Sequence, residues 1–177
     1  MIAYLKAFGA KHNLETKVDE AGNVLIKKTA TPGKENLQTV VLQSHIDMVC
    51  EKNNDVQHDF LTDPIETEID GEWLKAKGTT LGADNGIGVA TELAILADDS
   101  IEHGPLECLF TVDEETGLTG AFALQEGFMS GDILLNLDSE DEGEIFIGCA
   151  GGIDSVAEFT YKLSLIHISE PTRRVVI

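Results

Sequence analysis

The sequence is short of positive charge. Its 177 residues include only 12 Lys and Arg against 32 Asp and Glu, which gives a formal net charge of -20 at pH 7. Nucleic acids and anionic membranes recruit clustered Lys and Arg, so neither is expected as a partner. Multivalent cations are compatible with this charge, although surplus acids also serve simply to keep a protein in solution.

Cysteines and long hydrophobic runs are also scarce. The three cysteines are widely spaced and no C-x-x-C pair occurs, which excludes a zinc knuckle or a disulfide framework; Cys108 and Cys149 stand among apolar residues and are predicted to be buried. No stretch is long enough to span a bilayer, and the apolar run near the N-terminus is too short for a signal peptide. These absences predict a protein of the reducing cytoplasm.

The apolar pattern predicts an α/β domain with a mostly parallel sheet between helices. Helices are expected over residues 2–13, 84–98 and 117–127. Continuous apolar runs predict buried strands over residues 37–47, 106–113 and 132–138, with further strands over 22–28 and 143–152. Alternation on both sides of Asp70-Gly71 predicts a tight hairpin within residues 65–77.

Polar side chains follow each of the three runs that are expected to be buried strands. They are His45 and Asp47 after the first, Asp113, Glu114 and Glu115 after the second, and Asp138 and Glu140 after the third. In open α/β sheets, ligands bind beyond the carboxyl ends of the strands. One histidine and several carboxylates at that edge would suit a divalent metal, above all zinc.

The segment LGADNGIGVA, residues 81–90, places Asp84 among three glycines. Their spacing does not fit the G-x-G-x-x-G fingerprint of dinucleotide-binding proteins, and an acid at the centre would repel a phosphate. Asp84 could cap the helix that follows it through a bond to a backbone N–H. Alternatively, its carboxylate could be held out as a metal ligand at the same edge of the sheet.

Each of these acids also has an ordinary structural explanation. His45 could be a structural histidine, Glu114 and Glu115 could face a helix dipole, and Asp138 could begin a turn. These explanations leave open why the acids all follow buried strands, where their repulsion calls for a cation. His45 and Asp47 point the same way in an extended segment, so either both bind metal or Asp47 orients the imidazole.

Four segments of the chain resemble one family of dizinc exopeptidases. SHIDMV, GTTLGADNGIG, DEETG and NLDSEDEGEIFIGCAGG are similar to motifs of the aminoacyl-histidine dipeptidases, also called cytosol non-specific dipeptidases, which are related to carnosinases and bacterial aminoacylases. The resemblance extends over roughly residues 1–162. It implies hydrolysis of dipeptides, including Xaa-His types, with two Zn²⁺ ions for which Co²⁺ or Mn²⁺ can substitute.

The resemblance also implies a role for each residue of the site. His45 would bind one zinc ion with support from Asp47, and Asp84 would bridge both ions. Asp138 would bind the first ion, Glu115 would bind the second, and Glu114 would be the general base. An N-acyl amino acid deacylase and a non-catalytic metal-binding module remain as alternatives.

The chain departs from the family pattern in what it lacks. The family takes a further histidine for the second zinc after an inserted lid and dimerisation domain, and neither His103 nor His167 lies in a matching motif. We therefore expect residues 1–162 to be the N-terminal part of a catalytic domain, inactive by itself, from a parent that dimerises through the lid.

The C-terminal residues 163–177 do not continue this pattern. LSLIHISEPTR reads residue by residue, from Leu163 to Arg173, as the translation of a transposon-end sequencing adapter. Its opening LSLIHIS alternates apolar and polar residues, so a natural strand is the other interpretation. We predict a non-native tail, in which His167 has no functional role.

Overall fold

The computed structural model describes residues 1–139, 143–149, 151–152 and 155–160. Two compact units divide the chain, Met1–Glu142 and Gly143–Ile177, and every helix and strand of the described residues belongs to the first. Glu140, His167 and the whole predicted tail lie outside the described residues. Within the described part of the chain, no helix has both the length and the apolar character needed to cross a membrane.

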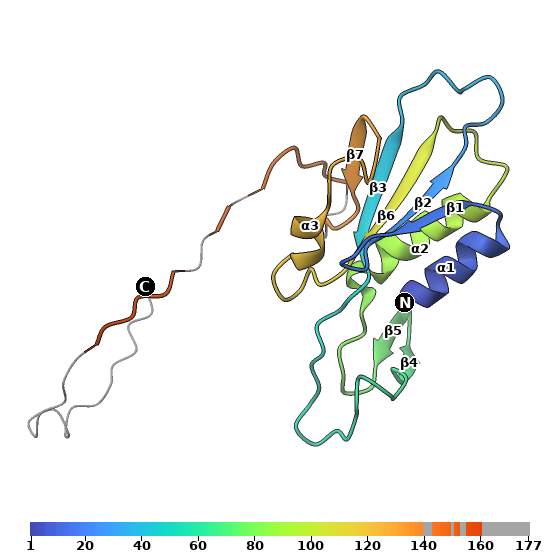
Figure 1. The fold of residues 1–177 in the computed structure, drawn as a ribbon. Coiled ribbons are helices and arrows are strands. Elements are labelled where there is room, and N and C mark those ends of the chain that lie inside the picture. Colours follow the sequence, from blue (N-terminus) through green and yellow to red (C-terminus); the bar gives the residue numbers. More distant parts are fainter. Residues whose placement is uncertain (140–142, 150, 153–154, 161–177) are drawn as a thin grey trace, which may run out of the picture. The chain divides into compact units, whose positions relative to one another are not determined.

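A five-stranded sheet forms the centre of the first unit (Figure 1). The order of the strands across the sheet is β1 (Glu15–Val18), β2 (Val24–Lys28), β6 (Leu106–Thr111), β3 (Val40–His45) and β7 (Ile133–Asn136). Strand β3 pairs in parallel with β6 on one side and β7 on the other, whereas β2 is antiparallel to both β1 and β6. The α/β fold is therefore confirmed, and the three strands that precede the acids are parallel, within a sheet that is mixed overall.

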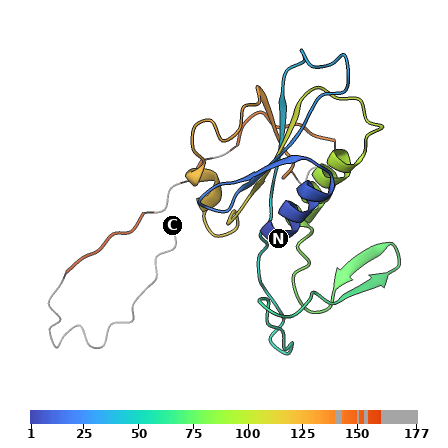
Figure 2. The ribbon, with the colours of Figure 1, turned by 45° about the vertical axis from the view of Figure 1, so that its right-hand side comes forward.

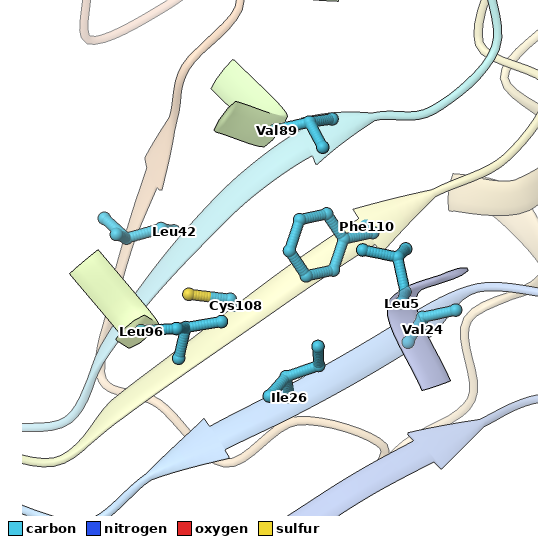
Figure 3. Close-up of a cluster of buried hydrophobic side chains, with 8 residues drawn as sticks. All are labelled: Leu5, Val24, Ile26, Leu42, Val89, Leu96, Cys108 and Phe110. Atoms are coloured by element: carbon cyan, nitrogen blue, oxygen red, sulfur yellow. The ribbon is translucent and has the colours of Figure 1, made fainter. Parts of the chain in front are cut away.

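Two helices, α1 (Ile2–Lys11) and α2 (Ala83–Ala97), cover one face of this sheet. Figures 1 and 2 show both on the same side, and Figure 3 shows the buried side chains between them and strands β2, β6 and β3. The short α3 (Thr119–Ala123) and the segment after it cover the other face, where Leu124, Phe128 and Met129 pack on the second core cluster. Because successive side chains of a strand point to opposite faces, each central strand contributes to both clusters.

The connection from β3 to α2 contains the predicted hairpin, formed by β4 (Thr67–Asp70) and β5 (Trp73–Ala76). Asp70 pairs with Trp73, which leaves a two-residue turn of Gly71 and Glu72. Gly71 has a φ of 64°, a conformation that glycine adopts without steric cost. The hairpin prediction is confirmed.

Three predictions about burial and strands were wrong. β7 lies at the edge of the sheet, and its residues Ile133, Leu134 and Leu135 are 39–49% exposed rather than buried. Residues 143–149, which were expected to begin a strand, form none, so Cys149 is exposed whereas Cys108 is buried as predicted. The edge strand β1 was not predicted, because its sequence ETKV is too polar to show a period.

Candidate metal centre

The parallel pairing brings the ends of three strands to one edge of the sheet. His45 is the last residue of β3 and lies opposite Thr111, the last residue of β6. On the other side of β3, Gln43 lies opposite Asn136 at the end of β7, so the chain reaches Asp138 two residues later, level with His45. The predicted convergence of these polar segments is therefore present.

His45 is the buried centre of the site, with 1% of its surface exposed. Its Nδ1 lies 3.1 Å from the backbone oxygen of Asp47, and its Nε2 lies 3.0 Å from Oδ1 of Asp84 and 3.5 Å from Oδ1 of Asp138. Assigning the ring proton to Nδ1, which then donates to Asp47, leaves the Nε2 lone pair facing two carboxylates. That arrangement is electrostatically unfavourable unless a cation occupies the space between them.

The carboxylates around His45 raise its pKa. Burial alone would lower the pKa, but the hydrogen bond with Asp84 and the charges of Asp138, Asp47 and Glu114 outweigh burial. The same crowding raises the pKa of the acids themselves, because neighbouring negative charges disfavour an ionised carboxylate. The pKa values of Glu114 and Asp138 are both raised, first by burial and then by neighbouring carboxylates.

Asp84 does not cap helix α2. Among the described residues, its side chain accepts no hydrogen bond from a backbone N–H of the helix, and its Oδ1 lies 3.0 Å from Nε2 of His45. Instead, Oδ1 of the buried Asn85 accepts a hydrogen bond of 3.0 Å from the backbone N–H of Gly88. The alternative in which Asp84 is a helix cap is therefore wrong, and its carboxylate faces His45.

Asn85 also holds Asp138, and the sequence analysis missed it. Its Nδ2 donates a hydrogen bond of 2.9 Å to Oδ1 of Asp138. One amide thus fixes the start of the helix with its oxygen and a carboxylate of the site with its nitrogen. The preference of asparagine for helix N-caps, immediately before the apolar period of the helix, was a signal that could have identified it.

Asp47 lies on the Nδ1 side of the imidazole, away from Asp84 and Asp138. Its Oδ2 accepts a hydrogen bond of 3.1 Å from the backbone N–H of Glu115, so it also holds the segment that contains the glutamate pair. Its Oδ1 is buried and makes no hydrogen bond, since its 3.4 Å approach to Nδ1 of His45 has ion-pair distance without hydrogen-bond geometry. Of the two predicted roles for Asp47, this placement matches support of the imidazole.

Two overlapping groups of side chains could hold a metal ion. Donor atoms within each group lie within 4.8 Å of one another, and His45 belongs to both; the groups are His45, Asp84 and Asp138, and His45, Glu114 and Glu115. One imidazole nitrogen with several carboxylate oxygens suits Zn²⁺. The carboxylates crowded around Nε2 of His45 agree with such a cation, so the residues present fit a metal.

His103 is not part of this site. It precedes the first residue of β6, at the opposite edge of the sheet, where its Nδ1 contacts the backbone oxygen of Gly104. The described residues therefore bring one histidine to the site, which agrees with the decision not to assign His103 a role.

Two hollows border the site on either side of Asp84. One has a volume of about 270 Å³ and the other about 330 Å³. Met48, Leu81 and Glu115 contribute to the first, and Ile87, Leu137 and Asp138 to the second. Both combine apolar walls with carboxylates of the site, as small-molecule pockets commonly do.

An α/β sheet with a histidine and several carboxylates at its carboxyl edge is the arrangement of a metal-dependent hydrolase. The chain belongs to peptidase family M20/M25/M40, whose sequence model matches residues 41–176. The predicted family resemblance is thereby confirmed.

Individual relatives support this assignment. The chain is 56% identical over 168 residues to the cytosol non-specific dipeptidase of Escherichia coli K12, covering 95% of this chain and 34% of that protein. The crystal structure of aminoacylhistidine dipeptidase from Vibrio alginolyticus matches with a TM-score of 0.80 and 58% identity, over 84% of this chain and 30% of that one. Aminopeptidase PepT from Bacillus cereus matches with a TM-score of 0.65 and 26% identity, over 78% and 37%. The chain spans about a third of the length of each.

Proposed function

We propose that this chain supplies most of a two-zinc site for the hydrolysis of dipeptides, including Xaa-His dipeptides. The observation that carries the proposal is the pair of overlapping groups around His45, with carboxylates from three separate segments of the chain. His45, Asp84 and Asp138 would hold the first ion, and Glu115, with Asp84 between the two ions, would hold the second. Co²⁺ or Mn²⁺ could replace zinc because all three accept nitrogen and oxygen ligands.

The bound ions would supply Lewis acidity, which polarises the scissile carbonyl and lowers the pKa of the attacking water. Glu114 would accept the proton of that water and transfer it to the leaving amine. Asp47 would keep the imidazole of His45 in its orientation through Nδ1. The hollows beside Asp84 would receive the two residues of the substrate. The names of the E. coli and Vibrio relatives support this substrate class.

The role of Glu114 is tested in a full-length family member that carries these residues. Glu114→Gln should lower turnover by roughly 10²- to 10⁴-fold, the usual contribution of a general base, while the zinc content stays at two ions per chain. Glu126→Gln, an exposed glutamate away from the site, is the matched control and should keep full activity. Retention of turnover by Glu114→Gln would remove Glu114 from the role of base.

We propose that the 177-residue chain by itself hydrolyses dipeptides poorly or not at all. Its described residues bring one histidine to the site, and the hollows beside Asp84 are open. A weakly held second ion and poor exclusion of water would both slow the reaction. Robust hydrolysis of a dipeptide panel by the purified chain would contradict this.

We further propose that the longer protein is cytoplasmic and forms a homodimer through a lid domain. The name of the E. coli relative supports the location. The dimer rests on the family resemblance alone. Gel filtration of a full-length family member, with and without its lid domain, tests it.

A further inference from the structure

The two glutamates of the site stand on a loop of residues 112–120, which follows β6. The loop is fastened internally: the carboxylate of Asp113 accepts hydrogen bonds from the hydroxyls of Thr116 and Thr119, and the backbone oxygen of Glu114 accepts from Leu118. The loop therefore behaves as one small unit. The positions of Glu114 and Glu115 relative to His45 therefore depend on the contacts that hold the base of this loop against the sheet.

Asn23 closes the base of the 112–120 loop. Its Oδ1 accepts a hydrogen bond of 3.1 Å from the backbone N–H of Val112, and its Nδ2 donates one of 2.8 Å to the backbone oxygen of Gly120. The two ends of the loop also bond to each other directly, from the N–H of Gly120 to the oxygen of Val112. Asn23 is fully buried, and 97 residues separate it from Gly120.

The amide of Asn23 has a fixed orientation because Asp19 holds its other hydrogen. Oδ2 of Asp19 accepts from Nδ2 of Asn23 at 2.6 Å, and Oδ1 of Asp19 accepts from the backbone N–H groups of Gly22 and Asn23. Both hydrogens of the amide are thus used, and its oxygen must face Val112. Buried polar groups that are satisfied in this way define one geometry of the chain around them.

Gly120 leaves no room for a side chain at this junction. A Cβ atom there would lie 2.2 Å from the backbone oxygen of Val112 and 2.6 Å from Oδ1 of Asn23. The junction is therefore closely packed on each side of the amide. A small shift of Asn23 moves the ends of the loop, and with them the two glutamates.

We propose that Asn23 is a positioning residue for the second metal ion. It fixes Glu115, the proposed ligand of that ion, through the base of the loop that carries the glutamate pair. Among the described residues, it makes no hydrogen bond to the segments that carry Asp84 and Asp138, which belong to α2 and to the residues after β7. Loss of Asn23 should therefore weaken one ion and spare the other. This inference rests on the proposed two-metal function.

Zinc titration of the 177-residue chain, by calorimetry and native mass spectrometry, provides the test. Asn23→Ala should weaken binding of the second ion roughly 10- to 100-fold, the usual effect of losing a group that orients a metal ligand. Binding of the first ion should change less than about two-fold. The matched control is Ile26→Ala, which removes a fully buried side chain from β2, the strand that follows Asn23, and it should leave both ions unchanged.

A second variant keeps the test decisive if Asn23→Ala fails to fold. Asn23→Asp retains the acceptor for Val112 but loses the donor to Gly120, and it should weaken the second ion in the same direction. Unchanged binding of both ions by either folded variant, or equal weakening of both ions, would overturn the role of Asn23. A wild-type chain that binds only one ion would instead contradict the two-metal proposal, and this inference with it.

Discussion

Nε2 of His45 lies 3.0 Å from Oδ1 of Asp84, although 39 residues separate the two in the sequence. The contact exists because β3 ends and α2 begins at the same edge of the sheet (Figure 1). The connection between them, which contains the hairpin of β4 and β5, therefore starts and ends beside the site. A buried imidazole with a carboxylate near each of its ring nitrogens is the physical basis of the proposed zinc site.

The first prediction concerns His45 itself. His45→Ala should lower the affinity for the first zinc ion by at least about 100-fold. Loss of a group that merely orients a metal ligand usually lowers metal affinity by about 10- to 100-fold, and here the ligand itself is lost. Isothermal titration of both proteins with Zn²⁺ measures the change. His103→Ala is the matched control, since His103 is a partly buried histidine that lies at the opposite edge of the sheet. Equal affinities of His45→Ala and His103→Ala would exclude His45 as a ligand.

The second prediction compares two glycines of α2. A Cβ atom on Gly88 would lie 2.1 Å from Oδ1 of Asn85, whereas one on Gly86 would meet nothing within 4 Å. Gly88→Ala should displace the amide that caps the helix, at a cost of about 1–3 kcal/mol, and should also weaken zinc binding through Asp138. Gly86→Ala should be neutral or stabilise by up to about 1 kcal/mol. Urea unfolding measures both; a Gly88→Ala protein as stable as Gly86→Ala would contradict this packing.

The third prediction concerns a buried acid that the site does not use. Glu92 is fully buried on α2, where its Oε2 accepts a hydrogen bond of 3.1 Å from Ser44 and its Oε1 has no partner. Burial raises its pKa from 4.5 to about 9, with the Ser44 hydrogen bond opposing the rise. Between these values the unfolded chain loses the proton and the folded chain keeps it, so stability falls as pH rises, by roughly 3 kcal/mol at pH 7.

Glu92→Gln removes this titration and keeps a partner for Ser44. The variant should gain stability relative to the wild type as pH rises from 5 to 8, as measured by urea unfolding at each pH. Glu72→Gln, an exposed acid of the hairpin turn, should show no such trend. A constant difference between Glu92→Gln and the wild type across this range would show that Glu92 is ionised in the folded chain.

The fourth prediction has the opposite dependence on pH. Glu107, 2% exposed on β6, accepts hydrogen bonds from Nζ of Lys27 at 2.5 Å and from the backbone N–H of Ser130 at 2.8 Å. Burial opposes its ionisation, but the bonds from Lys27 and Ser130 outweigh burial and lower its pKa. Its contribution to stability is therefore present above the ordinary carboxyl pKa and is lost as pH falls below it.

Glu107→Gln should destabilise the chain by about 3 kcal/mol at pH 7, because Lys27 loses its partner at a largely buried position. The difference from the wild type should shrink at pH 3. Glu68→Gln on the exposed hairpin serves as the control and should stay within about 0.5 kcal/mol of the wild type. A difference that stays the same at both pH values would contradict the lowered pKa.

The fold could be predicted where the apolar pattern is strong. β3 and β6 are continuous apolar runs and α2 has apolar residues at helical spacing, and the boundaries of all three lie within a few residues of the prediction. β7 was recognised as a strand, but its exposure was not, because an apolar run does not reveal whether a strand lies at the edge of a sheet. β1 escaped prediction because strand pairing with β2, not its own polar sequence, stabilises it.

The convergence of His45, Glu114, Glu115 and Asp138 was predictable because these residues follow strands whose ends meet at one edge of the sheet. The supporting role of Asn23 was not predictable, because it depends on backbone groups that lie far away in the sequence, such as the oxygen of Gly120. The hydrogen bond from Asn85 to Asp138 likewise joins residues that are 53 positions apart. A side-chain amide gives no periodic signal, and its partners appear only after the chain has folded. The supporting hydrogen bonds of this site therefore had to come from the structure.

The central claim is that the chain holds zinc between His45 and the surrounding carboxylates. Native mass spectrometry of the 177-residue chain, titrated with Zn²⁺ at neutral pH, tests it most directly, with Asp84→Asn measured alongside. The account predicts two zinc ions per wild-type chain, the second held more weakly, and weakened binding of both in Asp84→Asn. A wild-type chain that binds no zinc at millimolar concentration would contradict it.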